Sequence, residues 1–195
     1  MKLYSYVVTH DTGFSPNPFW GCCTLADCKP VIRRTAKVGD WVVGLSPKRS
    51  GNKIIYAMQI ERKIPFADYY RDSQYALKIP DFSKGKVVNK RGDNIYKPLP
   101  NGDFLQLQSM HSNGTFENPK TKIRDLGGKY VLIANTFYYF GSKPINLPHF
   151  LRDLKVGRAH KCKFPPEVVS TFIAFIKQQK VGINAPPTCW PSNDD

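Results

Sequence analysis

The sequence is poor in acidic side chains. Its 195 residues include 15 Asp and Glu against 29 Lys and Arg, which gives a net charge of +14. The excess is +5 over residues 1–60, +5 over 61–130 and +4 over 131–195, so no single basic tail accounts for it. A folded body this basic favours polyanions, because neutralising phosphates releases condensed counterions. We therefore expect a nucleic acid as partner; the alternative is a generic basic surface that maintains solubility.

Long apolar runs are also missing, since none approaches the ~18 residues of a transmembrane helix. The chain opens Met1-Lys2-Leu3-Tyr4 and continues directly into a strand-like pattern, without a signal-peptide core. We therefore expect a cytoplasmic protein with no membrane partner. Apolar residues make up 41% of the chain, enough for a core, and the length fits one domain.

Several catalytic and cofactor motifs are absent from the sequence. It contains no G-x4-G-K-[ST] phosphate loop and no G-x-G-x-x-G fingerprint after a strand. Their absence excludes the kinase, NTPase and Rossmann-type dinucleotide-binding classes of protein. No paired carboxylates and no Ser-His-Asp order stand out either. We predict no cofactor.

The cysteines are odd in number, and we expect them to be reduced. They are Cys22, Cys23, Cys28, Cys162 and Cys189. A metal site built from the first three with His160 and Cys162 is conceivable, but neither C-x2-C nor H-x3-H spacing occurs. Buried thiols are the commoner fate of free cysteines. We predict no metal site, and nothing in the sequence marks a cysteine as activated for catalysis with His160.

Strand-like segments dominate the first half of the chain. Strands are predicted over 3–9, 41–45, 54–60, 104–108, 130–133 and 137–140. Helices are predicted over 25–28, capped by Thr24, and over 30–34, 65–70 and 166–179. This order predicts an α+β domain: a small, curved, mostly antiparallel sheet or barrel with short peripheral helices and a C-terminal helix.

We expect a single domain over 1–182, followed by an irregular, Pro-rich tail over 183–195. Within the domain, residues 80–128 are rich in Lys, Asn, Gly and Pro and predict a long basic insertion with little regular structure. Long irregular segments of this kind are usually functional or mobile.

Three segments carry aromatic rings beside polar or cationic groups. They are the loop 10–21, with two prolines, two glycines and three aromatic rings, the segment 24–34, and the segment 137–143. If the strands at 3–9, 41–45 and 137–140 are neighbours, these segments converge. Rings beside cations suit base stacking, worth ~1–3 kcal/mol per base. The alternative is that the rings are all core.

Six sequence blocks resemble one family along nearly the whole chain. The blocks are YSYVV (4–8), GFSPNPF (13–19), CTLADCKPVIR (23–33), VGDWVVG (38–44), FYYFG (137–141) and GRAH (157–160). They resemble the second nucleotide-modification-associated domain family, and the layout is similar to the EVE and YTH domains of the PUA-like superfamily. The resemblance implies a PUA-like pseudo-barrel that accommodates a flipped, often modified base. It also implies bacterial or phage systems that modify DNA or recognise modified DNA; the insertion at 80–128 departs from those compact domains.

The leading hypothesis is therefore a nucleic-acid-binding module that recognises a modified base, with DNA favoured. The candidate base pocket consists of Phe14, Ser15, Asn17, Phe19, Thr24, Trp41 and Tyr138. The candidate phosphate contacts are Lys29, Arg33, Arg34 and Arg158. Extruding a base costs a few kcal/mol, which stacking and hydrogen bonds to its edge offset.

Two alternatives stay open. The first is an enzyme that acts on a nucleotide or modified base, with His160 as a weak catalytic candidate and Asp40 or Asp11 as its acid–base partner. A titratable pair within hydrogen-bonding reach inside the pocket would favour it. The second is a basic bacterial or phage factor that binds another protein and has no base preference.

Overall fold

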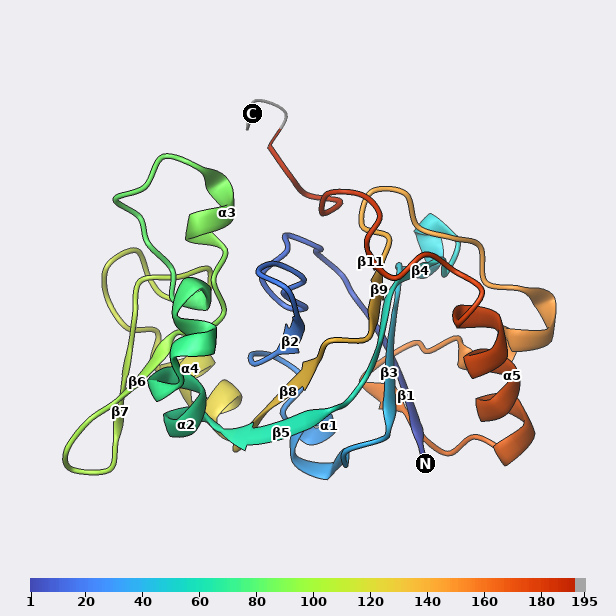
Figure 1. The fold of residues 1–195 in the computed structure, drawn as a ribbon, viewed down its shortest axis with the longest axis horizontal. Helices are drawn as coiled ribbons and strands as arrows, with labels where there is room; N and C mark the ends of the chain where they lie inside the picture. Colours follow the sequence, from blue (N-terminus) through green and yellow to red (C-terminus); the bar gives the residue numbers. More distant parts are fainter. Residues whose placement is uncertain (192–195) are drawn as a thin grey trace.

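A six-stranded sheet forms the centre of the computed structural model, which describes residues 1–191 (Figure 1). Its strand order is β10-β1-β3-β4-β9-β11. The strands are β1 (Leu3–Val7), β3 (Trp41–Leu45), β4 (Ile54–Gln59), β9 (Phe137–Tyr139), β10 (His160–Lys161) and β11 (Gly182–Ile183). The β1–β3 and β9–β11 pairs are parallel, and the other pairs are antiparallel. β1 and β3 are neighbours, but β4 separates β3 from β9, so the three strands whose adjacency would bring the ring-bearing segments together are not all neighbours.

Two smaller sheets complete the strands. One has the order β2-β8-β5, with β2 (Cys23–Leu25), β8 (Tyr130–Ala134) and β5 (Arg62–Pro65). The other pairs β6 (Tyr96–Pro98) with β7 (Phe104–Gln106). The predicted α+β class is confirmed, but within residues 1–191 the strands form three sheets and no closed barrel.

Helices are short, apart from one near the end of the chain. The α-helices are α1 (Pro30–Thr35), α2 (Phe66–Arg71), α3 (Val87–Lys90), α4 (Pro119–Leu126) and α5 (Pro166–Ile176). The 3-10 helices are η1 (Lys48–Ser50), η2 (Ser73–Lys78) and η3 (His149–Leu154). None of the helices in residues 1–191 has the length and apolar character needed to cross a membrane.

The two faces of the central sheet pack against different parts of the chain. Side chains alternate along a strand, so Trp41 and Val43 pack with Phe172 of α5, whereas Val42 packs with Leu25 and Leu132 of the second sheet. In Figure 1, α5 lies on one side of the sheet and the helices and strands of residues 80–128 lie on the other. The segment between β1 and β3 is the crossover that their parallel pairing requires.

Two sequence predictions are wrong at the level of secondary structure. Thr24 does not cap a helix over 25–28, because Cys23–Leu25 forms β2 and pairs with β8, Thr24 lying opposite Ile133. The segment 80–128 is more regular than predicted, since it contains α3, β6 and α4 besides β7, which lies within the strand predicted over 104–108. Its strands and helices depend on tertiary contacts that local composition does not reveal.

The C-terminal segment is tied to the loop after β1. The carboxylate of Asp11 accepts hydrogen bonds from the backbone N–H of Thr188 at 3.0 Å and from the hydroxyl of Tyr139. Its carbonyl accepts from the N–H of Cys189 at 2.7 Å. Ile183, at the start of the predicted irregular tail, belongs to β11, and residues 184–191 contain no helix or strand. Residues 192–195 of the predicted tail lie outside the described residues.

Candidate active site

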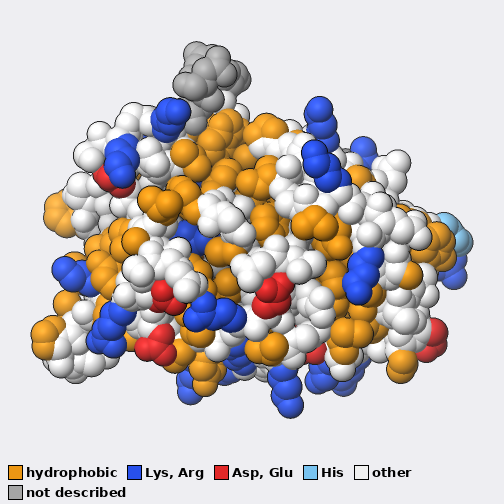
Figure 2. Space-filling view, in the orientation of Figure 1, with side chains coloured by type: hydrophobic (Ala, Val, Ile, Leu, Met, Phe, Trp, Pro, Cys, Tyr) orange, Lys and Arg blue, Asp and Glu red, His pale blue; other side chains and the backbone are white. Residues whose placement is uncertain are grey.

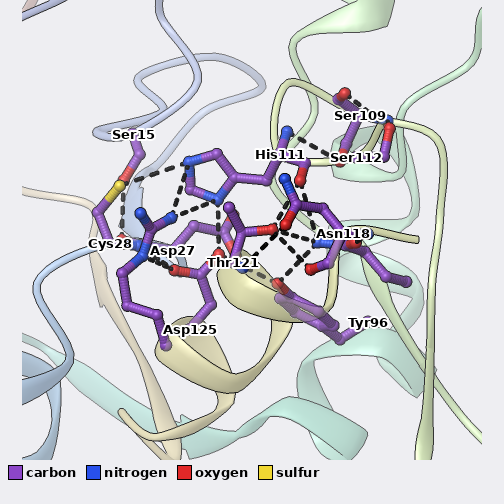
Figure 3. Close-up of polar contacts among 12 residues, drawn as sticks. Ser15, Asp27, Cys28, Tyr96, Ser109, His111, Ser112, Asn118, Thr121 and Asp125 are labelled. Carbon is purple, nitrogen blue, oxygen red and sulfur yellow. Dashed lines mark hydrogen bonds and ion pairs between the residues drawn. The ribbon is translucent and has the colours of Figure 1, made fainter. Parts of the chain in front are cut away.

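Three side chains from distant parts of the sequence form a hydrogen-bonded chain. The Sγ of Cys28 lies 3.5 Å from Nε2 of His111, and the other ring nitrogen, Nδ1, lies 2.5 Å from Oδ2 of Asp125. The imidazole is thus located between the thiol and the carboxylate (Figure 3). Cys28 precedes α1, His111 belongs to the loop between β7 and α4, and Asp125 is in α4. The order is thiol, imidazole, carboxylate.

The backbone of Cys28 adopts a conformation that L-residues rarely use. Its φ is 58°, and that of Lys29 is 39°. The N–H of Cys28 donates to Oδ1 of Asp125 at 3.0 Å, and its carbonyl accepts from Nε of Arg33 at 2.8 Å. Non-glycine residues at positive φ cost of order 1–3 kcal/mol and persist where the surroundings hold them. Here both backbone polar groups of the cysteine are held.

The loop that carries His111 is tied to the strand before it and to the helix after it. The carbonyl of His111 accepts from Oγ1 of Thr121 at 2.7 Å and from Nε2 of Gln106 at 3.4 Å. Its ring meets the ring of Phe14 edge-on, with centroids 4.8 Å apart. The side chain of His111 is 14% exposed. The ring is therefore oriented from several sides.

Asp125 is fully buried and multiply bonded. Besides His111 and the N–H of Cys28, its carboxylate accepts from the hydroxyl of Tyr96 and from Nε of Arg124, each at 3.0 Å. The buried guanidinium of Arg33 donates to its carbonyl at 2.5 Å. A buried carboxylate with this many donors stays ionised and orients what it binds.

The charges of the three groups reinforce one another. Burial would lower the pKa of His111, but hydrogen bonds with Asp125 and Cys28 raise it to about 10. Burial would raise the pKa of the Cys28 thiol, but the hydrogen bond and charge of His111 lower it. The pKa of Asp125 is lowered, because the same ring outweighs burial there too. These shifts all favour a thiolate on Cys28 beside an imidazolium on His111.

A second carboxyl beside the site is unlike Asp125. Asp27 is fully buried, and neither of its side-chain oxygens has a hydrogen-bond partner within residues 1–191. Burial and the negative charge of Asp125 raise the pKa of Asp27 well above its ordinary value. The carboxyl of Asp27 next to the site therefore keeps its proton to a higher pH than an ordinary aspartate does.

The chain of hydrogen bonds opens into a cavity of about 340 Å³. Its walls come from the end of β1, the loop after it and the loop before α4, and they include Tyr6, His10, Thr12, Phe14, Ser15, Cys28, Lys29, Met110 and His111. A second hollow of about 340 Å³ also includes Cys28 and Lys29, together with Arg124 and His160. Cys28 and Lys29 thus form part of the lining of both hollows.

The same three groups are possible metal ligands. Their donor atoms lie within 4.8 Å of one another. However, the Nδ1 of His111 is only 2.5 Å from Asp125, a hydrogen-bond distance. Two ligands of one Zn²⁺, each about 2.0–2.1 Å from the ion, lie farther apart in tetrahedral geometry. The site as built suits proton transfer better than metal ligation.

The residues proposed from the sequence for a base pocket divide into three groups. Phe14 and Ser15 line the cavity. Asn17 and Thr24 are buried in a polar network, where the ammonium of Lys78 donates to Oδ1 of Asn17 at 2.8 Å and Thr24 donates to Asp93 at 2.5 Å. These two side chains are engaged within the protein.

The remaining candidate rings lie elsewhere. Trp41 and Tyr138 stack on the α5 side of the sheet, with centroids 6.3 Å apart, and neither lines the cavity at Cys28. Phe19 packs between Trp20 and Trp190. Alternation along β3 and β9 determines which rings face α5, and the sequence does not show which side of the sheet carries the site.

The candidate phosphate contacts also differ in their surroundings. Lys29 lines both hollows, with its ammonium 4.6 Å from the centroid of the Tyr6 ring. Arg33 is buried and donates to three backbone carbonyls, those of Cys28, Asp125 and Tyr130. Arg34 and Arg158 are exposed. His160 lines the second hollow, and burial together with the charge of Lys29 lowers its pKa.

Sequence analysis missed His111 and Asp125. His111 is 83 positions from Cys28, and Asp125 is 97 positions from it. No local motif connects positions so far apart, and both missed residues belong to the segment interpreted as an irregular insertion. The one available signal was that a long segment of this kind is often functional.

Comparison with known proteins gives one result. The family model described as nucleotide modification associated domain 2 matches residues 1–194. Searches of curated proteins and of solved structures found no significant match. Because the model spans nearly the whole chain, this protein belongs to the nucleotide modification associated domain 2 family.

Proposed function

We propose that this protein binds a nucleic acid and recognises a modified base, flipped out of its stack, in the cavity beside Cys28 and His111. The observation that carries the proposal is the composition of this cavity. Aromatic rings, hydroxyl groups and a cation line a space of about 340 Å³, within the range of small-ligand sites. Membership of a family associated with nucleotide modification supports a base as the occupant.

Phe14 and Ser15 are the proposed contacts to the base. Phe14 forms part of the cavity wall, from which it is proposed to stack on the base, although it is only 3% exposed in the free protein. The hydroxyl of Ser15 donates to the carbonyl of Asp27 at 2.9 Å. Its oxygen keeps lone pairs that can accept from an exocyclic amine of the base. Both residues belong to the set predicted from the sequence.

Phosphate binding is assigned to exposed or cavity-lining cations. Lys29 lines the cavity and Arg158 is exposed close to His160 in sequence. Figure 2 shows Lys and Arg side chains spread over the face it presents, with few acidic ones between them. Arg33 is better placed to hold the backbone of Cys28, since its donors already engage three carbonyls.

The proposal extends to the wider setting of the protein. A PUA-like relationship, similar to EVE and YTH domains, accords with a pocket between the first loop and the sheet. DNA is the favoured nucleic acid, within a bacterial or phage modification system acting in the cytoplasm. The net charge of +14 supports a polyanionic partner of this kind.

A fluorescence-anisotropy titration tests the proposal. The probes are matched oligonucleotides with plain cytosine, 5-methylcytosine or 5-hydroxymethylcytosine, each at two salt concentrations. We expect a preference for one modified base that survives high salt. Phe14→Ala should reduce that preference by roughly 5- to 150-fold, the equivalent of ~1–3 kcal/mol of stacking. Circular dichroism checks that the variant is folded.

Phe150→Ala is the matched control, because Phe150 is an exposed ring on η3 and lies outside the cavity. It should bind as the unaltered protein does. Equal, steeply salt-dependent binding to every probe would reduce the site to a phosphate-binding surface. That result would contradict base recognition.

The enzyme alternative has a specific observation in its favour. A cysteine, a histidine and an aspartate form a hydrogen-bonded chain that reaches the same cavity. The histidine in this chain is His111, not the His160 that the sequence suggested.

A further inference from the structure

Cys28 differs from the other cysteines in its surroundings. Cys22 and Cys23 are buried, and burial raises the pKa of each thiol. Within residues 1–191, Cys28 is the cysteine whose thiol bonds to a histidine, and it lines two hollows. A nucleophilic cysteine needs thiolate character and access to its substrate. Cys28 has both.

The partners of Cys28 have the geometry of a nucleophile, a base and an orienting carboxylate. His111 faces the thiol with Nε2 and the carboxylate with Nδ1. Asp125 also holds the backbone N–H of Cys28, so one carboxylate orients both the base and the nucleophile. Arrangements of this order support covalent catalysis on unrelated folds.

We propose that Cys28 is a catalytic nucleophile that attacks the carbonyl carbon of an ester or amide carried by the bound base, with His111 as acid–base and Asp125 as the positioning residue. The assignment of the acyl group to a nucleic-acid base rests on the proposed function. The assignment of the nucleophile rests on the geometry of the three residues.

Each bond change in the reaction is accounted for by these residues and water. The thiolate of Cys28 adds to the carbonyl carbon, and a carbon–sulfur bond forms. The carbon–oxygen or carbon–nitrogen bond to the leaving group breaks as the imidazolium of His111 transfers its Nε2 proton to that group. Water then attacks the thioester, His111 accepts one of its protons, and the thiolate leaves. The products are a free acid and a base that carries an alcohol or amine.

The position of His111 next to Cys28 favours acyl transfer over other reactions of a thiol. Alcohols and amines are poor leaving groups unless they are protonated as they depart. An imidazolium adjacent to the attacking sulfur supplies that proton. Asp27 and Asp125 do not compete for this role, because Asp27 is buried outside both hollows and Asp125 is engaged by four donor groups.

The test uses the full-length protein with Cys162→Ser and Cys189→Ser, which removes the less buried thiols other than Cys28. Iodoacetamide labelling at pH 7, followed by peptide mass spectrometry, measures reactivity. We expect Cys28 to label at least tenfold faster than Cys189 does in the unaltered protein, and His111→Gln to slow it at least tenfold. If Cys28 labels slowly and His111→Gln leaves its labelling rate unchanged, the assignment of Cys28 as a nucleophile is overturned.

Acyl transfer is tested with p-nitrophenyl acetate. A burst of one equivalent of p-nitrophenol per protein, with acetate on Cys28, is expected, and Cys28→Ser should abolish it. The absence of a burst would overturn acyl transfer. Stoichiometric Zn²⁺ binding that depends on Cys28, His111 and Asp125, without a burst, would also overturn it and identify a metal site.

The outcomes separate this inference from the proposed function. Base preference is measured by anisotropy on the unaltered protein, and acylation is measured without nucleic acid. A burst with no base preference would leave Cys28 as the nucleophile and overturn the nucleic-acid substrate. A base preference with no burst would support a module that only binds.

Discussion

The backbone N–H of Cys28 donates a hydrogen bond of 3.0 Å to Oδ1 of Asp125, although 97 positions separate the two residues. The other carboxylate oxygen of Asp125 binds His111. The buried carboxylate of Asp125 thus fixes both the backbone position of Cys28 and the orientation of the His111 ring. The site depends on α4 as much as on the loop before α1.

Asp125→Asn should therefore disable the site. The amide retains an oxygen but offers an N–H₂ group where the carboxylate accepts from its donors, so the ring of His111 loses its orientation and its charge partner. We expect Cys28 alkylation to slow by ~100-fold and stability to fall by about 3 kcal/mol. Iodoacetamide kinetics and urea denaturation measure the two effects. Asp153→Asn, at an exposed aspartate, is the control and should change neither.

The pH dependence of stability should reveal the thiolate–imidazolium pair. His111 has an ordinary pKa of 6.5 and a native pKa of about 10, so its contribution is fully present below about pH 6.5 and is lost as the pH rises towards 10. The lowered pKa of Cys28 acts oppositely, since its contribution is present above the ordinary thiol pKa of 9.0 and is lost as the pH falls. Where the two titrations overlap, the contributions of His111 and Cys28 to stability therefore oppose each other.

Cys28→Ser removes the contribution of the thiol to the pH dependence of stability and leaves that of His111. The variant's free energy of unfolding should decline from about pH 6.5 upwards, relative to the unaltered protein, by up to about 1.4 kcal/mol per pH unit. The other titratable groups around the ring are Asp27, Tyr96, Arg124 and Asp125, and they are common to both proteins. Urea denaturation at several pH values measures the difference. Parallel pH profiles for the two proteins would contradict an ion pair.

Asp27→Asn should stabilise the protein. The raised pKa of Asp27 means that the native state holds a proton that the unfolded chain releases above its ordinary pKa of 3.8, so this residue lowers stability as the pH rises. An amide of similar shape removes that cost. We expect a gain of about 1 kcal/mol or more at pH 8 and a smaller gain at pH 5. Denaturation at both pH values would show it, and a loss of stability at pH 8 would contradict the raised pKa of Asp27.

Substitutions at Arg33 and Arg158 should distinguish an arginine that stabilises the fold from one that binds phosphate. Arg33→Lys removes a planar group that donates to three carbonyls, and an ammonium cannot reproduce that geometry. We expect it to cost about 2–4 kcal/mol of stability and to slow Cys28 labelling. Arg158→Ala, at an exposed position, should leave stability within about 0.5 kcal/mol and reduce the salt slope of DNA binding by ~1. Thermal denaturation and the anisotropy titration compare them.

Local pattern determined the longer strands and the longest helix. Strands at Trp41–Leu45 and Tyr130–Ala134 and the helix at Pro166–Ile176 follow from β-propensity and helical spacing. Elements whose identity depends on a partner were missed. Cys23–Leu25 is a strand because β8 pairs with it, and Tyr96–Pro98 is a strand because β7 does.

For the site, the sequence alone established a basic chain, a family resemblance and a ring-bearing loop, and these directed attention to Phe14, Ser15 and Lys29. Tertiary structure decided the chemistry. A hydrogen bond requires its donor and acceptor atoms to lie close together, and only folding brings the side chains of Cys28, His111 and Asp125 to separations of 3.5 and 2.5 Å. Neither charge, composition nor spacing encodes the proximity of residues about 90 positions apart.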